Sequence, residues 1–341
     1  MTHTQRIRNI LEGKPADRPA YIAWGPHANL EDRHIGDFVK HTINYQEYHD
    51  FDIIKVMPNG LYHTEDYGQL VRWGEDIEDA SYKNTIQYAL NTLEDWKKVK
   101  SPDIKKGAWA REIEVVRRVN DHFKGDVPVL ATVFGPANTA INISKVLQGK
   151  TNEFYAAHEK EYQSLMEVVT ENNIKLMEGF LQAGAAGFFY AQWGANLNRF
   201  SPAEYERYVK PYDLAALNAV KDKFWFTMLH VCGERIYMDK VLDYPVQALN
   251  WEDLSPLNPS LKQVRAMTDK VLMGGLDRNR DFLGSDREKI KDIIRDRIAI
   301  GIRDAGQKYI VAGGCEWNRN AAHRFTVLTE VIEELGAKHH G

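Results

Sequence analysis

The chain has 341 residues, of which 43% are hydrophobic, 27% charged and 11% aromatic, and this composition is typical of a folded globular protein. Its 44 Lys and Arg against 48 Asp and Glu leave a net charge of −4, which argues against a nucleic-acid partner. The sequence has no apolar stretch near the roughly 18 to 20 residues that span a bilayer. Its N-terminus also lacks the apolar core of a signal peptide. We therefore expect a cytoplasmic protein without a membrane partner.

The predicted elements alternate between short apolar runs and amphipathic segments. Residues 4–12 form a predicted helix that ends at the prolines of GKPADRP. Eight candidate strands follow, at 20–25, 52–56, 128–135, 186–194, 224–233, 246–253, 270–278 and 309–317. Helix-start residues precede the amphipathic segments between the later strands, namely Thr151, Ser201 with Pro202, Asn258 with Pro259, and Ser285.

Strands that alternate with helices are typical of a parallel sheet, and eight such units close into a (β/α)₈ TIM barrel. An open doubly wound sheet would carry a glycine-rich phosphate turn after its first strand, and WGPHANL has none. The stretch 60–92 alternates polar and apolar residues and predicts a β-hairpin insertion beside the barrel mouth. We treat residues 1–341 as a single α/β domain.

The two cysteines are too few for a disulfide framework, and their positions suggest a metal site. His230 and Cys232 lie two residues apart at the end of the fifth candidate strand, and Cys315 ends the eighth. In a barrel these two strand ends can face each other across the mouth. One imidazole and two thiolates suit a catalytic zinc with an open fourth position. A buried histidine and two small buried cysteines are the other interpretation, and the residues alone leave both open.

Several motifs together resemble the uroporphyrinogen decarboxylase superfamily over essentially the whole chain. They are GKPADRP after the first helix, HVCG, SPAEYERYVKPY, GGLD and YIVAGGCEW. Within that superfamily, the His-x-Cys and distant Cys resemble the zinc motif of the corrinoid-dependent methyltransferases, which include coenzyme M methyltransferases and O-demethylases. The resemblance implies a TIM barrel in which His230, Cys232 and Cys315 bind Zn²⁺. It also implies a corrinoid (cobalamin) carried by a separate partner protein, and it allows a homodimer.

The sequence departs from true uroporphyrinogen decarboxylases after its first two strands. These stretches read WGPHANLEDR and IIKVMPNG, where Arg33 is the only arginine and MPN offers no carboxylate. Because the carboxylates of a porphyrinogen need cationic partners, a uroporphyrinogen decarboxylase-like lyase is the less favoured alternative. A non-catalytic metal-binding or small-molecule-binding protein is a third.

A zinc site with two thiolates suits methyl transfer in either direction. Two thiolates neutralise Zn²⁺, so a bound substrate thiol would be deprotonated yet keep electron density on its sulfur. In the other direction, zinc would act as a Lewis acid on the oxygen of a methyl ether. A coenzyme M-like thiol would need Arg or Lys at the mouth, where Arg278 and Arg319 are the nearest candidates. The aromatic residues at the strand ends favour demethylation of an aromatic methyl ether.

Further site residues are predicted from their places at strand ends. We expect a fourth zinc ligand, a partner for His230 or a general acid among four acidic residues, although each also suits a helix cap: Glu252, Asp253, Asp277 and Glu316. The substrate pocket is expected to include Trp24, His27, Phe134, Tyr190, Gln192, Trp193, Asn250, Trp251 and Trp317.

Overall fold

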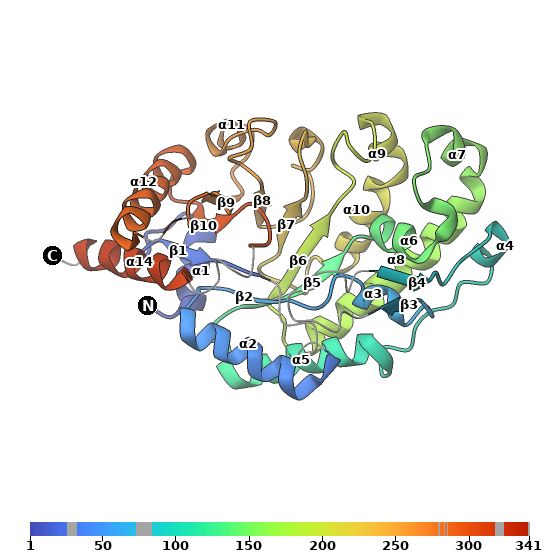
Figure 1. Cartoon of the computed structure of the whole chain (residues 1–341), viewed down its shortest axis with the longest axis horizontal. Helices are drawn as coiled ribbons and strands as arrows, with labels where there is room; N and C mark the ends of the chain where they lie inside the picture. Colours follow the sequence, from blue (N-terminus) through green and yellow to red (C-terminus); the bar gives the residue numbers. More distant parts are fainter. Residues whose placement is uncertain are drawn as a thin grey trace.

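The computed structural model describes residues 1–25, 33–72, 84–278, 280–282, 284, 286–317 and 324–339. Its centre is a sheet of eight parallel strands in the order β1-β10-β9-β8-β7-β6-β5-β2 (Figure 1). The strands are β1 (Ala20–Ile22), β2 (Ile54–Val56), β5 (Val129–Phe134), β6 (Gly187–Gln192), β7 (Met228–Val231), β8 (Ala248–Trp251), β9 (Val271–Leu276) and β10 (Tyr309–Gly313). Each lies inside one of the eight predicted runs, and the predicted (β/α)₈ TIM barrel is confirmed.

Asp52 joins the two ends of the sheet, β1 and β2. Its backbone N–H donates to the Tyr21 carbonyl at 3.0 Å, and its Oδ2 accepts from the Tyr21 N–H at 3.0 Å. The fully buried carboxylate also pairs with Arg6 at 2.5 Å, Arg18 at 2.7 Å and His3 at 2.9 Å. Because His3 and Arg6 lie on the first helix, α1 (His3–Leu11), this cluster holds α1 against the N-terminal end of the barrel.

Long helices cover the barrel. They are α2 (Ile35–His49), α5 (Gly107–Phe123), α8 (Glu159–Gln182), α10 (Lys210–Val220), α12 (Arg287–Ala305) and α14 (Phe325–His339). Figure 1 shows α2 and α5 side by side along one edge, with the first helix α1 near the last helix α14. The described residues contain no helix long and apolar enough to cross a membrane.

Shorter helices lie in the connections between strands and long helices: α3 (Tyr62–Glu65), α4 (Leu93–Trp96), α6 (Pro136–Ile143), α7 (Asn152–Ala157), α9 (Pro202–Tyr208) and α11 (Leu261–Arg265). Thr151 and Ser201 are the residues before α7 and α9, as predicted, and Ser201 forms a capping box with Glu204. The helix α11 begins later than predicted, because Ser260 rather than Asn258 caps it. Asp286 caps α12, and Ser285 lies outside the described residues.

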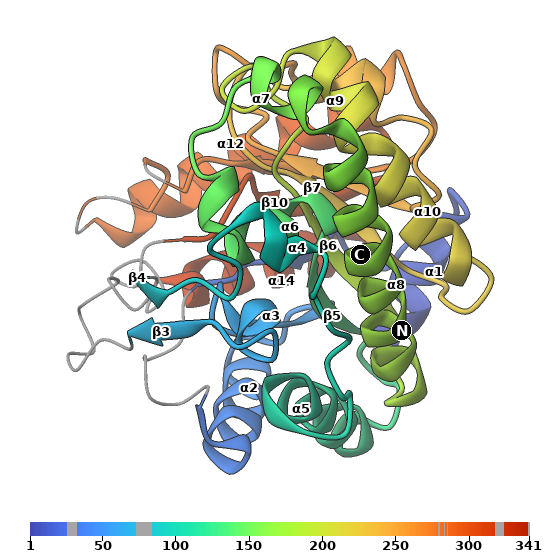
Figure 2. The same ribbon diagram turned by 90° about the vertical axis from the view of Figure 1, so that its right-hand side faces the viewer.

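The insertion predicted at 60–92 contains an antiparallel hairpin of β3 (Leu70–Arg72) and β4 (Asn84–Gln87), preceded by α3. Figure 2 shows the hairpin standing away from the barrel next to α3. The predicted hairpin is therefore confirmed, with residues 73–83 outside the described part of the chain.

Candidate metal centre at the barrel mouth

His230, Cys232 and Cys315 come together at the C-terminal ends of β7 and β10. Their ligand atoms, one nitrogen and two sulfurs, all lie within 4.8 Å of one another. Cys315 Sγ is 3.6 Å from His230 Nε2, and a sulfur and a nitrogen bound to one tetrahedral Zn²⁺ at about 2.3 and 2.1 Å are separated by roughly 3.6 Å. The donor set and its spacing therefore fit zinc.

Asn250 determines which nitrogen of His230 faces the sulfurs. Its Nδ2 donates to the carbonyls of Met273 at 3.0 Å and Gly313 at 2.9 Å, so its Oδ1 is the acceptor towards His230 Nδ1 at 2.7 Å. His230 Nδ1 thus carries the hydrogen, and Nε2 presents a lone pair towards Cys315. This is the tautomer that a metal-binding histidine needs, held by the kind of partner that orients such ligands.

The register of the sheet explains why these side chains meet inside the barrel. Ala191, His230 and Asn250 are paired residues on β6, β7 and β8, so their side chains point to the same side. Phe189, two residues before Ala191, stacks on the His230 ring with centroids 5.0 Å apart. The imidazole is therefore held by a hydrogen bond at Nδ1 and by an aromatic face.

The loop that carries Cys315 approaches β8 closely. A Cβ on Gly314 would lie 2.5 Å from the Glu252 Cα and 2.8 Å from the Trp251 carbonyl oxygen. Glycine is therefore required here to bring Cys315 to the centre. A hydrogen bond from the Cys232 thiol lowers the pKa of Cys315 well below its usual value, and it raises that of Cys232.

The four predicted acidic residues lie around this centre, and the carboxylates of three of them have partners of their own. Glu252 pairs with Arg278 at 2.6 Å, and burial raises its pKa while Arg278 opposes the shift. Asp253 accepts from the Gly275 N–H through both oxygens at 3.1 Å, and burial raises its pKa to about 7. Asp277 pairs with Arg280 at 2.5 Å, and the Glu316 carbonyl accepts from Arg278 at 2.9 Å. None of the four belongs to the cluster of three ligands.

A model of the family described as uroporphyrinogen decarboxylase (URO-D) matches residues 37–324. The chain belongs to the uroporphyrinogen decarboxylase family. It is 21% identical to the methylcobamide:CoM methyltransferase MtbA of Methanosarcina mazei, with 81% of this chain and 83% of the relative covered. It is 30% identical over 137 residues to a uroporphyrinogen decarboxylase of Syntrophotalea carbinolica, which covers 38% of each chain.

A solved methyltransferase structure from Methanosarcina mazei shares the fold. It superposes with a TM-score of 0.78 at 16% identity and covers 98% of this chain and 99% of that one. The resemblance found in the sequence is thus confirmed at the level of family and fold, and its corrinoid-related relatives are methyltransferases by name.

Three of the predicted aromatic residues lie near the mouth of this URO-D barrel. Trp24 packs edge-on against Phe189, with ring centroids 5.5 Å apart. Phe134 packs edge-on against Trp193 at 5.7 Å. Trp193 lies directly after β6, where Gln192 accepts a hydrogen bond from the Cys232 N–H through its carbonyl. Aromatic side chains therefore lie close to the candidate metal ligands on two sides.

Other predicted pocket residues are engaged in packing. Tyr190 is fully buried and donates to Asp213 on α10 at 2.7 Å, and Gln192 Nε2 donates to the same carboxylate at 3.2 Å. Trp251 is fully buried and donates to the Pro259 carbonyl at 2.7 Å. Trp317 packs on Phe282 and Phe325 in the hydrophobic core. His27 and Arg319 lie outside the described residues.

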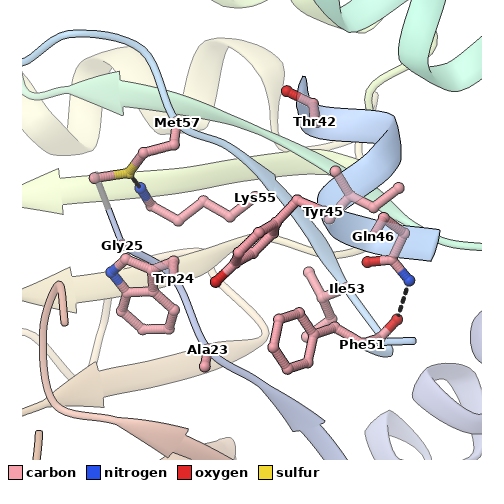
Figure 3. A pocket seen from close by; sticks show the side chains of 11 residues that line it. Ala23, Trp24, Gly25, Thr42, Tyr45, Gln46, Phe51, Ile53, Lys55 and Met57 are labelled. Atoms are coloured by element: carbon pink, nitrogen blue, oxygen red, sulfur yellow. Dashed lines mark hydrogen bonds between the residues drawn. The ribbon is translucent and has the colours of Figure 1, made fainter. Parts of the chain in front are cut away.

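Two cationic residues near the mouth were missed by the sequence analysis. Lys55 on β2 is buried, with 9% of its surface exposed, and its ammonium lies 4.2 Å from the Phe189 ring centroid. Figure 3 shows its side chain extending above Trp24 and Tyr45 to the Met57 sulfur, to which it donates. Arg199 follows β6, and its charge opposes the rise in the Cys232 pKa that the hydrogen bond with Cys315 and burial cause. The position of Lys55 within the apolar run of β2 could have indicated a buried lysine in the barrel. The sequence around Arg199 contains no such signal.

Proposed function

We propose that this chain is a zinc-dependent methyltransferase that moves a methyl group between a small molecule and a separate corrinoid protein. The observation that carries the proposal is the His230 tautomer, with Nε2 and the sulfurs of Cys232 and Cys315 converging at the barrel mouth. The corrinoid-related relatives, named methylcobamide:CoM methyltransferases, support the same reaction class.

The residues around the candidate centre have different roles in the proposed reaction. Asn250 keeps His230 in the metal-binding tautomer, and the two thiolates balance the charge of a divalent ion. Bound there, zinc would supply Lewis acidity towards a methyl ether oxygen or a substrate thiol. The Glu252–Arg278 ion pair lies beside Cys315 and adds a polar wall to the site.

We propose an aromatic methyl ether as the methyl donor. In this transfer the bond between the methyl carbon and the oxygen would break with its electron pair left on the oxygen, and the cobalt(I) of the partner's corrinoid would supply the electron pair for the bond to the methyl carbon. Water would protonate the phenolate. Trp24, Phe134 and Trp193 near the mouth suit a flat ring. A methylcorrinoid:thiol transfer is the second candidate, because the relatives are named for coenzyme M.

Metal analysis followed by a methyl-transfer assay tests the proposal. We expect about one zinc per chain, lost in His230→Ala, Cys232→Ala and Cys315→Ala while the far-ultraviolet circular dichroism is unchanged. The zinc-loaded protein is then mixed with a corrinoid protein reduced to cobalt(I), and the visible spectrum is followed while methoxybenzoates, methanol, methylamines and methyl thiols are offered in turn.

The outcomes separate the candidates. Methylation of the corrinoid from a methoxybenzoate supports the ether donor. Methyl transfer from methylcobalamin to a thiol, with no reaction of any ether, favours the thiol acceptor. A folded protein without zinc, or one that decarboxylates a porphyrinogen and transfers no methyl group, would overturn the proposal.

A further inference from the structure

A cavity of about 250 Å³ lies beside the candidate metal centre, slightly smaller than the roughly 300–1,000 Å³ of most small-molecule sites. It lies among the C-terminal ends of β5 and β6 and the helices α6 and α10. Gln192, which lines it, accepts the backbone hydrogen bond of Cys232 at 2.9 Å. Because neighbouring strands are about 4.8 Å apart, the cavity wall and a metal ligand are adjacent.

Arg199 brings a positive charge to the rim of this cavity. Its side chain is exposed, and the guanidinium carbon lies 5.9 Å from the centroid of the Trp193 ring. No carboxylate of the described residues forms an ion pair with it. A guanidinium at a cavity rim that has no carboxylate partner among the described residues is suited to a carboxylate or sulfonate, which it binds through two parallel hydrogen bonds.

The first turn of α6 adds donors to the same cavity. Gly135, Ala137 and Asn138 line it, and no side chain caps this helix. Asn138 is buried, with 7% of its surface exposed, and its Nδ2 has no hydrogen-bond partner among the described residues. A buried amide donor without a partner costs free energy, and a ligand oxygen would satisfy it beside the positive end of the helix.

The remaining wall suits the organic part of such a ligand. Trp193, Phe200 and Ile141 line the cavity with apolar surface. The buried Asp213 carboxylate also lines it, but its oxygens already accept from Tyr190 at 2.7 Å, Tyr244 at 2.9 Å and Gln192 at 3.2 Å. The cavity thus combines a donor-rich end with an apolar wall next to the metal ligands.

We infer that this cavity binds the anionic end of the small-molecule substrate, with Arg199 at its rim and Asn138 with the first turn of α6 at its wall. The inference rests on the proposed methyltransferase function. It narrows the substrate class to small organic anions, such as a methoxylated aromatic carboxylate or a thiol sulfonate, whose methyl-bearing or thiol end reaches the metal centre.

Calorimetric titration of the zinc-loaded protein, without any corrinoid, tests this. The probes are 4-methoxybenzoate, neutral methoxybenzene and 2-mercaptoethanesulfonate. We expect at least one anion to bind, and to bind about tenfold or more weakly in Arg199→Gln and in Asn138→Leu, since a hydrogen bond to a charged group is worth about 1.5–3 kcal/mol. Methoxybenzene affinity should not change in Arg199→Gln.

Arg235→Gln is the matched control, because Arg235 is another exposed arginine at the mouth but does not line the cavity. It should bind the anions like the unchanged protein. Failure of both anions to bind, or equal affinity in Arg199→Gln, would overturn the inference. Arginine-dependent binding without methyl transfer would uphold it and count only against the proposed function.

Discussion

A 2.7 Å hydrogen bond joins Asn250 Oδ1 and His230 Nδ1. His230 is the donor, because both amide hydrogens of Asn250 are donated to the carbonyls of Met273 and Gly313. One residue thereby links β8, β9 and β10 and selects the tautomer of a ligand on β7. The candidate ligand His230 is thus already oriented for a metal, and under the proposed function the affinity for zinc should depend on Asn250, which is not one of the three candidate ligands.

Asn250→Leu keeps the branched shape of the side chain but removes the acceptor and both donors. We expect zinc affinity to fall about 10-fold to 100-fold, as for other residues that orient metal ligands, measured by competition with a chromophoric chelator. The free energy of unfolding should fall as well, by about 1–3 kcal/mol, because two buried carbonyls lose their donor. Asn218→Leu on the exposed face of α10 is the control, and an Asn250→Leu protein with unchanged zinc affinity would contradict the prediction.

Gly314→Ala tests the close approach of the Cys315 loop to β8. The new Cβ would meet the Glu252 Cα at 2.5 Å and the Trp251 oxygen at 2.8 Å, so the loop must move. We expect a loss of about 1–3 kcal/mol in the free energy of unfolding, together with weaker zinc binding. Gly36→Ala, where nothing lies within 4 Å of the new Cβ, should leave zinc binding unchanged. Equal zinc affinity in both variants would count against the loop's role.

Asp52→Ala tests the closure of the barrel between β1 and β2. Removal of the buried carboxylate leaves Arg6 and Arg18 without their shared partner, and breaking a buried pair costs about 3–5 kcal/mol. Urea unfolding followed by circular dichroism measures the loss. Asp103→Ala, which removes an exposed pair with Lys106 at 3.4 Å, should cost less than about 1 kcal/mol. Similar losses in the two variants would show that Asp52 does not close the barrel.

His3 makes stability depend on pH. Burial lowers its pKa, but hydrogen bonds to Asp50 and Asp52 outweigh burial and raise the pKa from 6.5 to about 9. The folded protein therefore holds this proton more tightly than the unfolded chain. The contribution is complete below pH 6.5 and is lost as the pH rises through about 9. His3→Asn should remove this slope, worth up to about 3 kcal/mol, as measured by urea unfolding at several pH values. Parallel curves for the two proteins would refute it.

The sequence by itself determined the strands, the family and the three ligand candidates. Apolar runs such as 186–194 and 309–317 are read from local hydrophobicity, and two residues of one strand, His230 and Cys232, necessarily share a face. The eightfold alternation then predicted a barrel, which brings the ends of β7 and β10 to one mouth. These conclusions need only short-range pattern and the geometry of one fold.

Only the tertiary structure decided what each strand-end residue contacts. The alternation of a strand predicts that Tyr190 and Ala191 face opposite sides of the sheet. Only the tertiary structure shows that the Tyr190 hydroxyl reaches Asp213 on α10. Asn250 meets His230 through register, and Arg199 lines the cavity through the path of a loop. Such contacts join residues that are far apart in the chain. Their distances depend on how the whole barrel packs, and a local sequence pattern does not contain that information.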